Sequence, residues 1–336
     1  MLVLGRPGSG CTSLLRVLSN DRASFDEVDG ETRYGSADHN EAKGFRQQIM
    51  FNNEGKQHLV TPGKDRMLIG IDDLHFPTLT VNRTMKFALR NKVPAERPEH
   101  LQQKEGYVKN KRDEILDSLG ISHTQKTRVG NEFIRGVSGG ERKRVSLAEM
   151  MAGQSPVQFW DNPTRGLDSK TAAEFGCMLR QEADTNGKTI VATMYQAGNT
   201  VYNQFDKILV LAEGRVIYYG PRSMAQQYFE DLGFITPRGA NIADFLTSVT
   251  VLTERIVQPG LEDKVPSTPD EFETRFRETA IYSQVMGSIE PPEKLTHEIE
   301  DMKMAVSTEK RKQHFPRSQS VYTASIWEQI QTCTLR

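Results

Sequence analysis

The sequence lacks any long hydrophobic run and has almost no net charge. Its longest apolar runs, such as ILVLA at residues 208–212, fall far short of the roughly 18 residues that a membrane-spanning helix needs. The opening MLVLG has no basic region of the kind that begins a signal peptide. A formal net charge of −1 provides no field that would attract nucleic acid or an anionic membrane. These absences predict a soluble chain with no transmembrane segment and no nucleic acid partner.

Cysteine is also scarce. The three cysteines, Cys11, Cys177 and Cys333, are odd in number and far apart, which predicts a reducing compartment and no disulfide partner. The chain does have 336 residues, of which 37% are hydrophobic and 26% are charged. These values are typical of one large or two modest globular domains with a sizeable core.

Strand-like and helix-like patterns alternate between residues 137 and 220, which predicts an α/β layer fold. The apolar run VQFWD, ending in an acid, is typical of a buried strand. It is followed by the amphipathic pattern SKTAAEFGCMLRQEA, which predicts a helix with Phe175, Met178 and Leu179 facing inward and Cys177 buried and inert. Helical periodicity is also present at residues 80–120.

A glycine-rich stretch, GRPGSGCTS, follows the apolar residues MLVL and precedes the helical pattern TSLLRVLSN. It fits the phosphate-binding loop GxxxxGK[ST], except that cysteine stands where the lysine should be. Glycines let backbone N–H groups turn around phosphate oxygens, and the following helix adds its dipole. A glycine-rich turn without a ligand is the alternative that this stretch alone leaves open. The candidate nucleotide-binding residues of the loop are Gly5, Arg6, Pro7, Gly8, Ser9, Gly10, Cys11, Thr12 and Ser13.

Two further motifs argue against a chance match. VSGGERKR at residues 137–144 predicts a second anion-binding turn, made by Ser138, Gly139 and Gly140 at the start of a helix. The buried strand that ends at Asp161 is the usual way to place a carboxylate on the Mg²⁺ of a phosphate-loop NTPase, with the Thr12 hydroxyl as the other metal ligand.

This set of motifs resembles the nucleotide-binding domain of ABC transporters. VSGGER is similar to the family signature LSGGQ, and GLDS to its D-loop. The resemblance is closer still to the first nucleotide-binding domain of fungal pleiotropic-drug-resistance transporters, the G-type subfamily. The stretches that carry it are HFPTLTV, NEFIRGVSGGERKR, DNPTRGLDS and FDKILVLAEGRVIYYGP, and VPSTPDEFETRF and SVYTASIWEQI extend it.

The resemblance implies a phosphate-loop NTPase fold of the ABC ATPase type. Residues 1–250 would form the nucleotide-binding domain, with a helical subdomain at about residues 80–150. Residues 251–336 would form a charged linker leading towards a membrane domain that the chain lacks. Because MLVL is only the end of a strand, and no upstream aromatic stacks the adenine, we expect the N-terminus to be truncated.

The same resemblance implies a degenerate phosphate site. Cys11 replaces the lysine, Asn162 replaces the glutamate that would follow Asp161 and act on water, and Tyr195 replaces the switch histidine. A neutral thiol loses charge-assisted bonds worth roughly 1.5–3 kcal/mol, and an amide loses general-base catalysis worth roughly 10²–10⁴ in rate. We expect a site that binds ATP and Mg²⁺ but hardly hydrolyses ATP, with Cys11 as a reactive thiolate at the helix N-terminus.

The signature residues Ser138, Gly139 and Gly140 are intact. Glu141 stands in place of the family's usual glutamine, but it resembles the form found in the G-type subfamily. ABC domains pair head to tail, so this turn would complete the competent site of a second nucleotide-binding domain. The resemblance thus implies a drug-efflux ATPase whose partners are that second domain and transmembrane domains, at the cytoplasmic face of a membrane. A soluble ABC-type regulatory ATP binder and a non-functional truncated gene product are the alternatives.

Glu54 is the candidate Q-loop residue, because joining it directly to Asp72 gives FNNEDDLHFPTLTV, an uninterrupted match to the resembled family. Residues 55–71 are then extra. A tolerated surface insertion is one explanation, since loop closure costs little more as length grows. We favour a translated intron, because Gly55–Lys56 and Ile71–Asp72 can be encoded by splice-donor and acceptor sequences in frame, and sequencing the spliced messenger RNA decides between the two.

Overall fold

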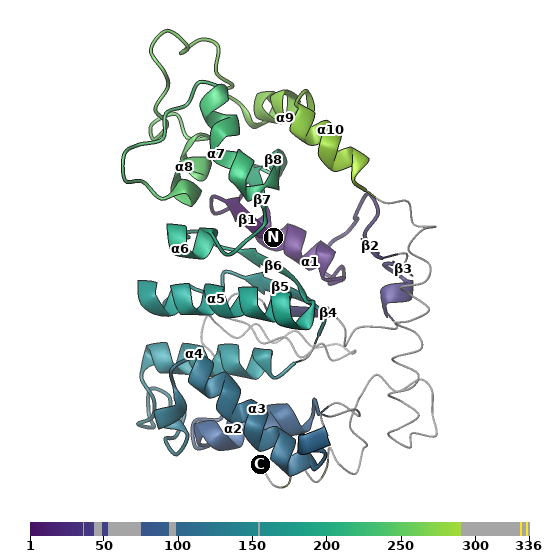
Figure 1. Cartoon of the computed structure of the whole chain (residues 1–336), viewed down its shortest axis with the longest axis vertical. Coiled ribbons are helices and arrows are strands. Elements are labelled where there is room, and N and C mark those ends of the chain that lie inside the picture. The colour runs from purple at the N-terminus through teal and green to yellow at the C-terminus, as the bar shows by residue number, and fades with distance from the viewer. Residues whose placement is uncertain are drawn as a thin grey trace. The chain divides into compact units, whose positions relative to one another are not determined.

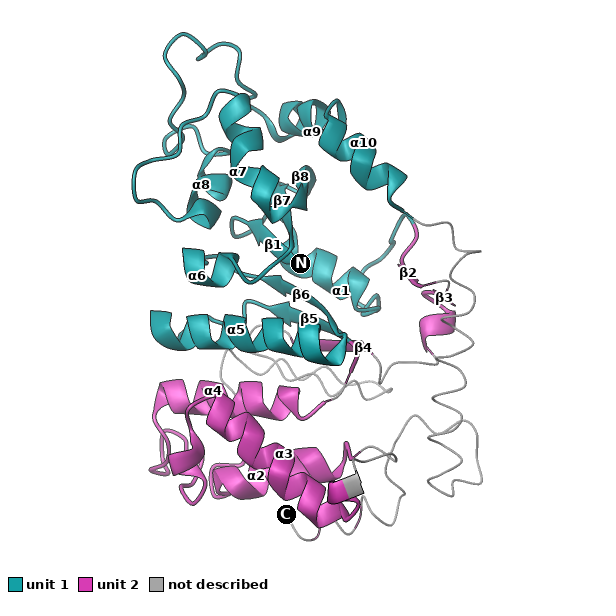
Figure 2. Cartoon of the chain, in the orientation of Figure 1, with its two compact units in different colours: residues 1–30, 157–291 teal, residues 31–156, 292–336 magenta. Residues whose placement is uncertain are grey.

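The computed structural model describes residues 1–35, 37–43, 49–52, 75–93, 99–153, 155–289, 330 and 334. The chain divides into two compact units, one of residues 1–30 and 157–291, the other of residues 31–156 and 292–336 (Figure 2). The candidate Q-loop residue Glu54 and the proposed intron at residues 55–71 lie outside the described residues.

The first unit is built on a mixed sheet in which strands that are far apart in the sequence lie side by side (Figure 1). Within this unit the strand order is β5-β6-β1-β7-β8; the neighbours from β5 to β7 pair in parallel, and β8 pairs antiparallel with β7. Every residue of β1 is buried, as expected for a strand inside a parallel sheet that is covered on both faces. The strands are β1 (Leu2–Gly5), β5 (Val157–Asp161), β6 (Thr189–Thr193), β7 (Lys207–Ala212) and β8 (Arg215–Pro221).

Helices pack on this sheet, and α5 shows why the sequence forms them. Its N-cap Asp168 accepts a hydrogen bond from the Thr171 N–H at 3.0 Å, and Gly187 ends it with a positive φ of 63°. Phe175 of α5 is buried edge-on against Trp160 of β5, with ring centroids 5.4 Å apart. The helices are α1 (Cys11–Leu18), α5 (Ser169–Asn186), α6 (Asn199–Tyr202), α7 (Arg222–Asp231), α8 (Ile242–Ser248), α9 (Pro269–Arg277) and α10 (Ala280–Gly287).

Residues 251–289, expected to belong to a charged linker, contain α9 and α10 and fold with the first unit. Thr268 and Glu271 form a capping box that fixes the start of α9. Phe276 of α9 is buried, with its ring centroid 5.8 Å from that of Tyr218 on β8. Aromatic packing therefore holds this stretch against the edge strand of the sheet.

The second unit contains a helical part formed by α2, α3 and α4. The buried Arg112 of α3 donates a hydrogen bond from Nη1 to the Asn82 Oδ1 of α2, at 2.6 Å. His75, at the start of the HFP stretch, contacts α4: its Nε2 lies 2.8 Å from the Oγ of Ser146. The elements of this unit are β2 (Arg33–Tyr34), β3 (Ala37–Asp38), β4 (Ile49–Asn52), α2 (Val81–Arg90), η2 (Glu99–Leu101), α3 (Lys104–Ser118), η3 (Ser122–Thr124) and α4 (Gly139–Met151).

Candidate functional site

The phosphate loop runs from the end of β1 to the start of α1. Gly8 and Gly10 have φ angles of 90° and 94°, in the left-handed region where glycine is strongly favoured. The Ser9 N–H donates to the Arg6 carbonyl at 2.9 Å, and the Ser9 carbonyl accepts from the Gly214 N–H at 3.1 Å. The loop is therefore a closed turn with a second support from the β7–β8 hairpin, and a helix begins directly behind it.

Asp161 lies at the end of β5 with its carboxylate held from two sides. Oδ2 accepts from the Thr12 hydroxyl at 2.9 Å, and Oδ1 accepts from the Thr193 hydroxyl of β6 at 2.7 Å. The sheet register explains this geometry, because Asp161 and Thr193 are paired at the ends of parallel neighbours. The structure thus brings together Thr12 and Asp161 as the sequence predicted, and adds Thr193, which no motif in the sequence indicated.

Thr12 and Asp161 suit Mg²⁺, which prefers oxygen ligands and keeps several waters beside one or two protein groups. Their two oxygens already lie within hydrogen-bonding distance, so one ion could take both with little movement. Among the described residues, no group of three or more His, Cys, Asp or Glu side chains could hold a metal.

Cys11 does not project as a reactive thiolate. The residue is 5% exposed, and a Cβ added to Gly5 would stand 2.7 Å from its Sγ, so the sulfur lies close against the strand end. Burial, and then the negative charge of Asp161, raise the pKa of the Cys11 thiol to about 11. The expectation of a reactive Cys11 is therefore wrong, and so is that of a buried Cys177, which is exposed. The helix dipole favours a thiolate, but at Cys11 desolvation outweighs it.

Asn162 and Tyr195 follow the ends of the adjacent strands β5 and β6. Asn162 is 5% exposed and has a φ of 45°, a left-handed conformation that asparagine tolerates better than most residues. Its N–H donates to the Thr193 carbonyl at 3.1 Å and to the Thr193 hydroxyl at 2.9 Å. Tyr195 is half-buried two residues beyond β6. Both residues therefore lie at the same edge of the sheet as Asp161.

The signature turn lies in the second unit, at the N-terminus of α4. Ser138 and Glu141 form a capping box: the Glu141 N–H donates to Ser138 Oγ at 3.3 Å, and the Ser138 N–H donates to Glu141 Oε2 at 2.8 Å. A Cβ added to Gly139 or Gly140 would meet no atom within 4 Å, so the turn presents open backbone.

His123 of η3 adds a contact that the sequence did not reveal. Its Nε2 lies 2.9 Å from Glu141 Oε1. The hydrogen bond from the Ser138 N–H, followed by that of His123, holds the pKa of Glu141 below its usual range. Glu141 therefore stabilises the local structure of this turn through contacts with both Ser138 and His123.

A phosphate loop, an acid-ended neighbouring strand and a helical part with a glycine turn are features of the ABC ATPase fold. The family profile described as "ABC transporter" matches residues 1–165, and one described as "ABC-2 type transporter" matches residues 195–335. The two matches therefore divide the chain into an N-terminal stretch similar to ABC transporters and a C-terminal stretch similar to ABC-2 type transporters. No helix among the described residues is long and apolar enough to cross a membrane.

Two curated relatives are fungal multidrug transporters. The chain is 69% identical, over its whole length, to ABC multidrug transporter G of Aspergillus fumigatus, and 43% identical to ABC multidrug transporter H of the same species. It spans 24% and 22% of these proteins, about a quarter of their length. Among solved structures, it is similar to cbiO1 from Clostridium perfringens, at 19% identity and a TM-score of 0.48, with 69% of this chain and 80% of that chain covered.

Proposed function

We propose that this chain is the ATP-binding part of an ABC drug-efflux transporter, and that its own phosphate site binds Mg-ATP but barely hydrolyses it. The observation that carries the proposal is the pairing of Thr12 and Asp161 at 2.9 Å beneath a formed phosphate loop, beside a buried, neutral Cys11. Ligands for Mg²⁺ are present, while the groups that would drive hydrolysis are replaced.

The proposal assigns a role to each residue of the candidate site. The loop from Gly5 to Ser13 offers backbone N–H groups to phosphate oxygens, and Thr12 and Asp161 would hold the ion. When bound, Mg²⁺ neutralises charge on the β- and γ-phosphates. Asn162 cannot accept a proton from water at neutral pH, because an amide is not a base of useful strength. Tyr195 offers a phenol where an imidazole could carry positive charge.

The signature at Ser138, Gly139 and Gly140 would act on another domain's nucleotide. In support, its glycines are open and Ser138 is exposed. The partners we propose are a second nucleotide-binding domain and transmembrane domains, with the chain at the cytoplasmic face. The match of residues 195–335 to an ABC-2 type transporter supports this assembly over a free-standing regulatory ATP binder.

Titration of the 336-residue chain with a fluorescent ATP analogue, with and without Mg²⁺, tests the proposal. We expect Mg²⁺-dependent binding, together with phosphate release close to the rate of a protein-free blank. Thr12→Val keeps the side-chain shape and removes the hydroxyl, so it should remove most of the dependence on Mg²⁺. Steady turnover by the wild-type chain alone, or no binding at all, would contradict the proposal.

A further inference from the structure

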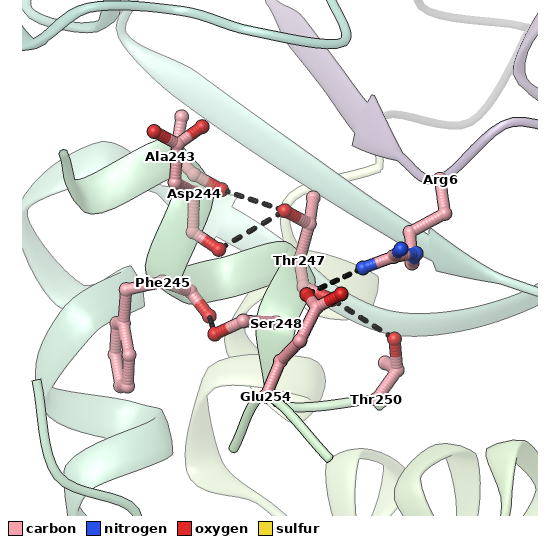
Figure 3. Close-up of polar contacts among 8 residues, drawn as sticks. All are labelled: Arg6, Ala243, Asp244, Phe245, Thr247, Ser248, Thr250 and Glu254. Atoms are coloured by element: carbon pink, nitrogen blue, oxygen red, sulfur yellow. Dashed lines mark hydrogen bonds and ion pairs between the residues drawn. The ribbon is translucent and has the colours of Figure 1, made fainter. Parts of the chain in front are cut away.

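Arg6 is the only charged residue in the phosphate loop GRPGSGCTS. Its side chain is 45% exposed, and Nη1 donates to Glu254 Oε2 at 2.6 Å (Figure 3). Cys11, at the usual lysine position, is neutral and turned against Gly5. Arg6 therefore carries the only positive charge that a phosphate would meet at this loop. In the structure, that charge is paired with the Glu254 carboxylate.

The carboxylate side of the pair is built into folded structure. Glu254 lies on a succession of turns that continues from α8, as its N–H donates to the Val251 carbonyl at 3.1 Å and the Val251 N–H to the Ser248 carbonyl at 2.9 Å. The Thr250 hydroxyl donates to the Thr247 carbonyl at 2.9 Å and braces the same turns (Figure 3). The backbone beneath Glu254 is thus fixed, while Arg6 is long enough to change partner by rotating its own side chain.

We propose that Arg6 supplies the missing cation to the nucleotide phosphates, and that Glu254 competes with the nucleotide for it. The inference rests on the proposed function, because it concerns regulation of that same site. A guanidinium binds phosphate through two parallel hydrogen bonds, whereas an exposed ion pair contributes little and exchanges easily.

The pair further links two parts of the sequence. Arg6 lies in the region matched by the ABC transporter profile, and Glu254 in the region matched by the ABC-2 type transporter profile. When Arg6 turns to phosphate, the segment after α8 loses a contact with the phosphate loop. Nucleotide binding would therefore change the contacts of residues 195–335, the stretch that matches the ABC-2 type transporter profile.

Variants that neutralise one charge at a time in the whole chain test this exchange. Glu254→Gln should tighten binding of the fluorescent ATP analogue about twofold to fivefold, because a competing exposed ion pair is lost. Arg6→Gln should weaken binding about tenfold, and adding Glu254→Gln to it should change nothing further. Glu262→Gln makes the same change of charge at an exposed acid outside the pair, and should leave binding as in the wild type.

The direction of the effects separates exchange from a structural role. If the pair only stabilised the loop, Glu254→Gln and Arg6→Gln would both weaken binding. That result, or equal affinity of Glu254→Gln and the wild type, overturns the inference while the proposed function stands. No binding by the wild-type chain overturns the proposed function itself. The charge-reversed double variant Arg6→Glu, Glu254→Arg should keep the wild-type melting temperature and bind the analogue at least tenfold more weakly.

Discussion

The sulfur of Cys11 lies against Gly5, so that a Cβ built on Gly5 would stand only 2.7 Å from Sγ. Two residues that begin and end the phosphate loop are thus packed on each other. The contact is possible because Gly5 has no side chain and the thiol of Cys11 is small. The thiol of Cys11 is accordingly buried, with 5% of the residue exposed.

The first prediction concerns this packing. Gly5→Ala should destabilise the chain by about 1–3 kcal/mol, because the added carbon overlaps Cys11 and comes 3.0 Å from the Leu211 carbonyl. The same change should cost less in a Cys11→Ala background, with a coupling of about 0.5–3 kcal/mol in urea unfolding. Gly8→Ala is the control: its φ of 90° strains alanine, but nothing lies within 4 Å, so its cost should not depend on Cys11.

The second prediction concerns thiol chemistry. At pH 7.5, a condition at which a thiol of pKa about 11 stays protonated, alkylation should label exposed Cys177 well before Cys11. The thiolate fraction of Cys11 grows about tenfold for each pH unit below its pKa, so its labelling rate should climb steadily between pH 7 and 10. Mass mapping follows each site separately. Preferential labelling of Cys11 at neutral pH would show that the thiol is not buried as described.

The third prediction restores the loop's cation. Cys11→Lys should tighten ATP binding by about tenfold, the effect of roughly 1.4 kcal/mol from one improved charged contact. Cys11→Met has a similar length without charge, and we expect no tightening from it. Fluorescence titration of the three proteins side by side gives the comparison. Unchanged or weaker binding by the lysine variant would contradict this prediction.

The fourth prediction is that Asn162→Glu alone does not create an ATPase. Asn162 has a φ of 45° and is 5% exposed, so glutamate would adopt a left-handed backbone at a cost of about 1–2 kcal/mol. Its carboxylate would also be buried next to that of Asp161. Urea unfolding should show the loss of stability, and phosphate release should stay near the blank. Asn162→Gly, which accepts positive φ, should lose less stability than the glutamate variant.

The parts of the fold with strong local patterns were predictable. The acid-ended run VQFWD became β5, and the pattern after it became α5 with Phe175, Met178 and Leu179 buried. Glu213 and Gly214 form the turn between β7 and β8, with φ angles of 47° and 81°. In these segments, periodicity and turn chemistry agree with the tertiary structure, so local reasoning suffices.

Features that depend on long-range packing were not predictable. The inward direction of Cys11 follows from a contact with Gly5, and the partners Thr193 and Glu254 reach the site from distant elements. Helix periodicity assigned Cys177 to the buried side, yet the flanking Phe175 and Met178 take that side without it. The role of Glu54 and the origin of residues 55–71 stay predictions.

The central claim is that the intact signature works on a partner's nucleotide while the chain's own site does not turn over. The direct test is ATPase turnover of ABC multidrug transporter G in which this 69% identical chain replaces the matching region. Ser138→Arg should abolish turnover, because arginine removes the cap of α4 and fills the open turn. Ser118→Arg, at the exposed end of α3, adds the same side chain to the helical part and should leave turnover intact. Wild-type turnover by the Ser138→Arg protein would contradict the account.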